Sequence, residues 1–230
     1  MNKDLTNEND SILREMDYLD NNKKIIAVSK LSQTADEKII TKMISLLDDN
    51  DITIRGEVFS ALYLNENDIS KKLISGLSET SKNIRAFCSL ILANRNDKNA
   101  IESIIKLTSD SNSTVRSCAF GALGHLEAKN ASDEIRQGIF DSNIEVKKSA
   151  AYALILVNKE FSDAEIIELE KQEDSEFIKI LKKNSYMVDR KGFEPLTSRM
   201  PCAHPTRLND RPISNIKNET DFVKVYQHLT

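Results

Sequence analysis

Four basic residues recur along the chain at an almost constant spacing, and an acidic residue precedes each of them by six positions. The basic residues are Arg55, Arg85, Arg116 and Lys147, which are separated by 30, 31 and 31 residues. The preceding acids are Asp49, Glu79, Asp110 and Asp141. Such side chains can move protons in a catalytic site or form ion pairs, although carboxylates on acidic helices usually form solvated faces.

Apolar residues repeat in step with the four basic residues. They stand one residue before, three after and seven after each of them, which is one face of a helix: Ile54, Val58, Leu62; Ile84, Cys88, Leu92; Val115, Ala119, Leu123; Val146, Ala150, Leu154. A second amphipathic set lies eight to twelve residues upstream, and turn-forming residues such as Asp110-Ser111-Asn112 lie between the two sets. Each repeat therefore predicts two antiparallel helices joined by a tight turn.

The repeat extends beyond these four units. A step back of 31 residues from Arg55 reaches Lys24 and a first unit with more polar residues, whereas the pattern fades after Lys147. The sequence thus predicts an all-α fold, an α-solenoid of about six antiparallel helix pairs over residues 9–187. Residues 1–8 are expected to be disordered.

Composition agrees with a helical, non-membrane protein. The chain of 230 residues has a net charge of −4, no Trp, and four prolines that all follow residue 194. The longest apolar run, residues 150–157, is far shorter than the roughly 18 residues of a membrane span, and the start does not read as a signal peptide. We expect a cytoplasmic monomer, and the acidic charge disfavours nucleic acid and anionic membranes as partners.

The segment STVRSCAFGALGHLEAKNASDEI, residues 113–135, resembles the short HEAT-like repeat of phycobilisome lyases and of many archaeal and bacterial adaptor proteins. The resemblance covers most of the repeat region and is specific for the fold rather than for a function. It implies that the second helix of each pair lines the concave face. It also implies that the turn acids and the basic residues form a structural ladder, so we interpret these charges as structural.

Most catalytic motifs are missing from the sequence. There is no glycine-rich phosphate loop, no Gly-x-Ser-x-Gly elbow and no His-Glu-x-x-His helix. The repeat region holds a single histidine, His125, and the three cysteines form no close pair, so we expect no metal and no cofactor. A non-catalytic interaction scaffold is the leading hypothesis. A lyase-related enzyme or enzyme accessory acting on a cofactor-bearing protein is one alternative, and a nucleic-acid binder is a second.

The positions one, five and nine residues after each basic residue fall opposite the apolar face of the second helix. They are Gly56, Ser60, Leu64; Ala86, Leu90, Asn94; Ser117, Gly121, His125; Lys148, Tyr152, Leu156. Only one of these twelve residues is charged, which suits a peptide or helix better than a phosphate group. The predicted partner-binding residues are Leu64, Leu90, Asn94, His125, Lys148, Tyr152 and Leu156, and the predicted partner is a protein.

The last part of the chain, residues 188–230, departs from the repeat. The string DRKGFEPLTSRMPCAHPTRLNDRP resembles a tail of proteins whose reading frame crosses a transfer-RNA gene on the opposite strand. Gly192-Phe193-Glu194-Pro195 can be encoded by GGA-TTC-GAA-CC, the reverse complement of the T-arm sequence. Cys202 and His204 lack further metal ligands nearby. We interpret this segment as a disordered gene-overlap extension.

Overall fold

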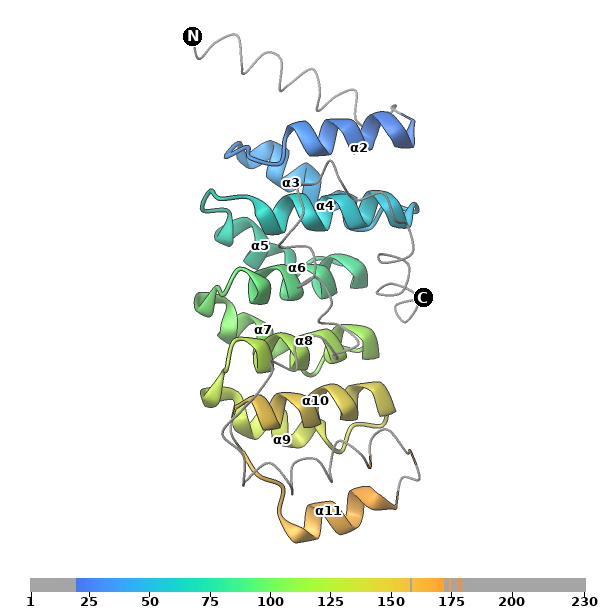
Figure 1. Cartoon of the computed structure of the whole chain (residues 1–230), viewed down its shortest axis with the longest axis vertical. Helices are drawn as coiled ribbons and strands as arrows, with labels where there is room; N and C mark the ends of the chain where they lie inside the picture. Colours follow the sequence, from blue (N-terminus) through green and yellow to red (C-terminus); the bar gives the residue numbers. More distant parts are fainter. Residues whose placement is uncertain (1–19, 158, 172–173, 175–177, 179–230) are drawn as a thin grey trace, which may run out of the picture.

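The computed structural model describes residues 20–157, 159–171, 174 and 178, and within them every regular element is helical (Figure 1). The predicted disordered start, residues 1–8, and the predicted tail, residues 188–230, lie outside the described residues, as do the codon-based interpretation of the tail and both Cys202 and His204.

The helices stack as antiparallel pairs along one axis (Figure 1). The second helices of the pairs are α2 (Asn21–Lys30), α4 (Ile52–Leu64), α6 (Lys82–Asn94), α8 (Ser113–His125) and α10 (Ile144–Leu156). The first helices are α3 (Glu37–Leu46), α5 (Ser70–Gly76), α7 (Ile101–Leu107), α9 (Ser132–Gly138) and α11 (Asp163–Glu170). Short 3-10 turns, η1 (Lys98–Ala100) and η2 (Lys129–Ala131), lead into α7 and α9. The predicted α-solenoid is confirmed, with four complete pairs from α3 to α10 among the described residues.

The second helices begin where a short polar side chain caps them. Asp51, Ser81, Asn112 and Asn143 stand four residues before the basic residues, and each accepts hydrogen bonds from backbone N–H groups of the first turn. Such caps satisfy donors that the helix itself leaves open. The sequence thereby sets the same starting point for four successive helices, which keeps the repeats in register.

Two second helices, α6 and α8, end in the same left-handed turn. Asn96 has φ 54° and Glu127 has φ 51°. After α6, the Asn96 N–H donates to Ala93 O at 2.8 Å and the Asp97 N–H donates to Leu92 O at 3.0 Å, the pattern of a Schellman motif. The chain is thereby turned sharply back toward the next first helix.

The core lies between the rows of first and second helices. The predicted apolar set of the second helices is buried, as are the central residues of the first helices; Met43, Leu73, Ile104 and Ile135 have no exposed surface. Because each helix pair shares its apolar faces with its neighbours, no pair has a complete core alone. The fold is therefore held together repeat by repeat.

Side-chain size differs between the junctions that join successive second helices. Between α8 and α10, Ser117 Oγ lies 2.7 Å from Ser149 Oγ, and a Cβ built on Gly124 would lie only 2.8 Å from the Cα of Ala153. Between α4 and α6, the rings of Phe59 and Phe87 meet edge to face with centroids 6.1 Å apart. Since interhelical distance follows the size of the side chains between two helices, the α4–α6 junction is built wider than the α8–α10 junction.

Candidate interaction surface

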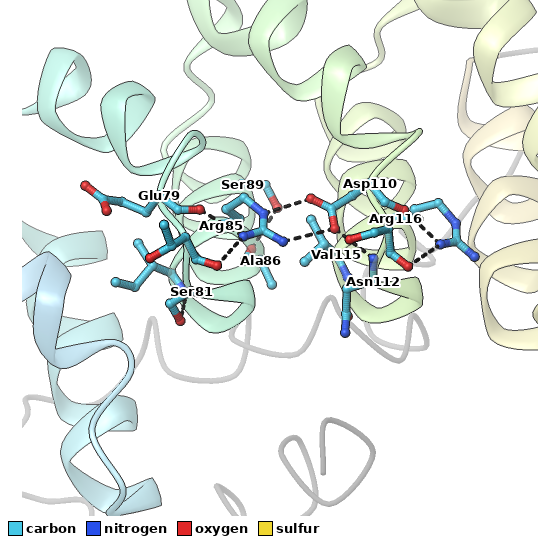
Figure 2. A network of polar contacts seen from close by, with 12 residues as sticks. Glu79, Ser81, Arg85, Ala86, Ser89, Asp110, Asn112, Val115 and Arg116 are labelled. Carbon is cyan, nitrogen blue, oxygen red and sulfur yellow. Dashed lines mark hydrogen bonds and ion pairs between the residues drawn. The ribbon is translucent and has the colours of Figure 1, made fainter.

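The turn acids and the basic residues form a ladder of bidentate ion pairs along the solenoid (Figure 2). Arg85 Nε donates to Asp110 Oδ2 at 2.7 Å, and its second terminal nitrogen donates to Oδ1 at 3.0 Å. Arg116 holds Asp141 in the same way, at 2.7 and 2.8 Å. These side chains are only 10–15% exposed, so each pair is fixed between two turns.

Each aspartate of the ladder also organises its own turn. Asp110 Oδ1 accepts the Asn112 N–H at 2.8 Å, while the Asp110 carbonyl accepts from Arg116 at 2.8 Å. Burial alone would raise the pKa of Asp110, but the hydrogen bonds from Arg85 and from the Asn112 N–H outweigh it and lower the pKa below its ordinary value. The carboxylate is therefore held in its charged form, in contact with two successive repeats.

The ladder pairs residues of neighbouring repeats, which differs from the six-residue pairing that the sequence suggested. Within one repeat the arginine reaches only the backbone carbonyl of the acid, as Arg55 does to Asp49 O at 2.7 Å. The carboxylate partner lies 25 residues later, in the next turn. The same spacing joins Lys24 to Asp49, at 3.3 Å, a contact that the sequence analysis did not predict. Lys147 is half-buried, and its charge helps to lower the pKa of Asp141.

The ladder is interrupted between Arg55 and Glu79. Arg55 donates to the carbonyls of Asp49 and Asn50, and among the described residues no carboxylate forms an ion pair with it. Glu79 occupies the position of the ladder aspartates, yet its side chain is exposed and extends away from Arg85 (Figure 2). The Asn112 N–H donates to the Asp110 carboxylate, but among the described residues the Ser81 N–H has no such carboxylate acceptor. One turn thus lacks both interactions that an aspartate makes elsewhere.

The predicted partner-binding residues lie on the second helices, and most of them keep some exposure. Leu64, Asn94, His125 and Leu156 occupy the same position near the ends of α4, α6, α8 and α10 and are half-buried. Tyr152, one turn earlier on α10, is also half-buried. Equivalent positions on successive stacked helices form a row along the solenoid, so these side chains share one surface, which we call the second-helix face.

Two predicted residues of this face are buried, which corrects the expectation that they point into solvent. Leu90 is 7% exposed and Lys148 is 6% exposed. The Lys148 ammonium lies 3.1 Å from the Glu145 carboxylate and 3.4 Å from Asp174, a residue that follows α11. A periodicity argument treats a helix in isolation and cannot include coverage by residues far along the chain. The one charge of the predicted groove is consequently paired rather than open.

Groups with potential for metal or redox chemistry are scarce. No cluster of three or more His, Cys, Asp or Glu residues that could hold a metal ion occurs in the described part of the chain. Burial lowers the pKa of His125, which favours its neutral form, and burial raises the pKa of the Cys88 thiol to about 12. Cys118 is fully buried as well. Both cysteines therefore lie in the packed core, and the raised pKa of Cys88 leaves its thiol without the thiolate character that reactivity needs.

Sequence reasoning did not find a polar clamp at the far end of the α4–α6 junction. Arg95, which follows α6, donates to the backbone carbonyls of Leu62, Asn65 and Asn67 at the end of α4. Asn65 is 2% exposed and donates to Ser32 O and Thr34 O, both at 2.8 Å. The clamp satisfies carbonyls that the end of a helix leaves open. Its only sequence signal is an arginine next to a helix end, which is too common to be predictive.

Comparison with known families agrees with this geometry. A family model described as HEAT repeats matches residues 70–155, the region from α5 to α10. Over these residues the chain is built of HEAT-like repeats. No curated protein matches the sequence.

Three of the solved structures with a similar arrangement are engineered or designed proteins. One engineered protein is 17% identical in sequence, and the match covers 76% of this chain and 93% of the engineered one, with a TM-score of 0.46. The coverages below are given in the same order. A designed armadillo repeat protein has 17% identity, 75% and 96% coverage and a TM-score of 0.43. A computationally designed armadillo repeat protein for modular peptide recognition has 15% identity, 76% and 98% coverage and a TM-score of 0.42.

Among the described helices, none combines the length and the apolar character that crossing a membrane requires.

Proposed function

We propose that this protein is a non-catalytic scaffold that binds an extended or helical segment of a partner protein on its second-helix face. The observation that carries the proposal is the row of half-buried side chains Leu64, Asn94, His125 and Leu156, one from each of four successive helices. A partner segment laid along this row would contact every repeat in turn. Apolar and amide side chains at regular intervals suit such an extended contact.

The electrostatics of the face support a protein partner. The charge of Lys148 is paired with Glu145 and Asp174, and burial favours the neutral form of His125. The face therefore offers apolar contacts and neutral hydrogen-bonding groups. Phosphate-rich partners require clustered cations, which this row does not supply.

The test uses two partly exposed residues at one end of the face. After a partner has been identified by affinity purification and prepared in pure form, its affinity is measured by calorimetry for wild type and for the Tyr152→Ala/Leu156→Ala double variant. Loss of two interface anchors is expected to weaken binding at least about tenfold, or about 1.4 kcal/mol. Helical content should stay the same, because neither residue is fully buried.

Ile167→Ala provides the matched control, since Ile167 is a large apolar residue on α11 that is 63% exposed and belongs to no second helix. Its affinity for the partner should equal that of wild type. Binding that is unchanged in the double variant, or that falls equally in the control, would show that the second-helix face is not the docking surface.

A further inference from the structure

The interrupted turn of the ladder contains hydrogen-bond donors that elsewhere bind a carboxylate. In the intact turns, Nε and one terminal nitrogen of the arginine grip Asp110 or Asp141, and a backbone N–H two residues after the aspartate donates to the same carboxylate. At the interruption the equivalent donors are Arg55 and the Ser81 N–H. No acceptor for the Arg55 Nε or for this N–H occurs among the interactions of the described residues.

The Arg55 guanidinium is already held in position. Its other terminal nitrogen donates to Asp49 O at 2.7 Å and to Asn50 O at 3.3 Å. Arg116 makes the corresponding two bonds, to Asp110 O and Ser111 O. A guanidinium fixed on one side presents its remaining donors as a planar fork, which matches a carboxylate in bidentate geometry. The Arg55 guanidinium is thus anchored as Arg116 is in a turn that holds an aspartate.

We propose that Arg55 and the Ser81 N–H form a binding site for a carboxylate of a partner protein, at the turn between α5 and α6. The partner's carboxylate would take the place that Asp110 and Asp141 take in the following turns. This site lies on the side of the helix-connecting turns, so it is independent of the proposed docking on the second-helix face.

The surrounding charges favour a singly charged group over a phosphate. Asp48 reaches this turn and accepts a hydrogen bond from Asn83 at 2.7 Å, Asp49 is paired with Lys24, and Glu79 is exposed beside the site. A dianion would double both its attraction to the Arg55 guanidinium and its repulsion from nearby carboxylates, and the carboxylates of Asp48 and Glu79 outnumber that one guanidinium.

The test follows the arginine Nε–H resonances of the full chain by NMR during titration with sodium acetate, against sodium chloride at equal ionic strength. The resonance that disappears in Arg55→Gln belongs to Arg55. This resonance is expected to shift saturably with acetate and not with chloride. The resonances of Arg85 and Arg116 should stay in place, because their forks are occupied. An Arg55 resonance that moves no more than these two would overturn the proposal.

Two variants and a second anion sharpen the result. Glu79→Asp places an aspartate at the ladder position and should lose most of the acetate response, whereas Glu79→Gln removes a nearby negative charge and should respond at several-fold lower acetate concentration. Lys98→Gln, which removes an exposed cation elsewhere, should behave as wild type. Saturation by phosphate at a lower concentration than acetate would overturn the assignment to a carboxylate. A loss of thermal stability in Glu79→Gln would show that Glu79 itself occupies the site and would also overturn it.

Discussion

Shortening one side chain by a single methylene tests how the ladder stabilises the solenoid. Glu79 stands where Asp49, Asp110 and Asp141 stand in the other turns, but its carboxylate makes neither the ion pair nor the turn hydrogen bond. Glu79→Asp keeps the charge and restores the length that the other turns use. We therefore expect Glu79→Asp to close the ladder and to raise the free energy of unfolding.

The size of the gain follows from the intact rungs. In the Arg85–Asp110 pair, two hydrogen bonds of 2.7 and 3.0 Å join side chains that are 15% and 10% exposed. Exposed pairs contribute about 0.2–1 kcal/mol, and a partly buried bidentate pair contributes somewhat more, because solvent screens it less. The turn hydrogen bond adds about 0.5–1 kcal/mol. The sum is about 1–2 kcal/mol, or about 2–8 °C in Tm for a chain of this length.

Urea unfolding followed by circular dichroism measures the gain, and a double-mutant cycle with Arg55→Gln separates its parts. In the Arg55→Gln background Glu79→Asp can restore only the turn hydrogen bond. The gain in the free energy of unfolding should therefore be about half of that in the wild-type background. The reverse substitution at an intact turn, Asp110→Glu, should lower the free energy of unfolding by a similar amount. Because a paired aspartate has a folded pKa below its unfolded value, the gain should be present above about pH 4 and should vanish as the pH falls through the folded pKa.

An unchanged or reduced stability of Glu79→Asp would refute the reasoning. It would show that the extra methylene is not the cause of the interruption. The remaining cause would then be the spacing of the repeats, which the Phe59–Phe87 contact sets at this junction.

Four further variants test local features of the fold. Glu127→Gly should stabilise the protein by about 0.5–1 kcal/mol, because a left-handed conformation costs a non-glycine residue more, and Asn96→Gly should gain less, because asparagine tolerates it. Gly124→Ala should cost about 1–3 kcal/mol, since the added methyl group would meet the backbone of Ala153 at 2.8 Å. Burial raises the pKa of Glu57, so the folded state loses stability relative to the unfolded state as the pH rises through that pKa. Glu57→Gln should therefore be more stable than wild type near pH 7 and should lose this advantage in acid. Thermal melts across pH measure the difference.

Helix positions were predictable from the sequence because they depend on local patterns. The apolar residues around Arg55, Arg85 and Arg116 mark the buried face of each second helix, and short polar residues such as Asn112 mark where the helix begins. Both signals lie within a dozen residues of each other. Their repetition predicted the stacking as well, because a helix pair with one apolar face needs a neighbour to cover it.

Contacts between repeats were harder to predict. The spacing of 25 residues that joins Arg85 to Asp110 is present in the sequence, but a spacing of six residues fits the same acids and bases. Only the stacking distance decides which partner lies within reach of the guanidinium. The burial of Lys148 has a similar cause, since Asp174 approaches it from beyond α11. A helical pattern contains no information on such distant residues.

At the junction between α4 and α6, polar contacts join the two repeats at one end, whereas the ion pair of the ladder is missing at the other end. At the end of α4, Arg95 ties the two repeats together through four backbone carbonyls, whereas at the turn end Arg55 has no carboxylate partner among the described residues. Between these ends stand the rings of Phe59 and Phe87. In a solenoid each repeat is held only by its neighbours, so a junction fixed at one end can adjust its spacing only at the other. A carboxylate bound at Arg55 would supply the missing contact there, and it would thereby stiffen the junction as well as hold the partner.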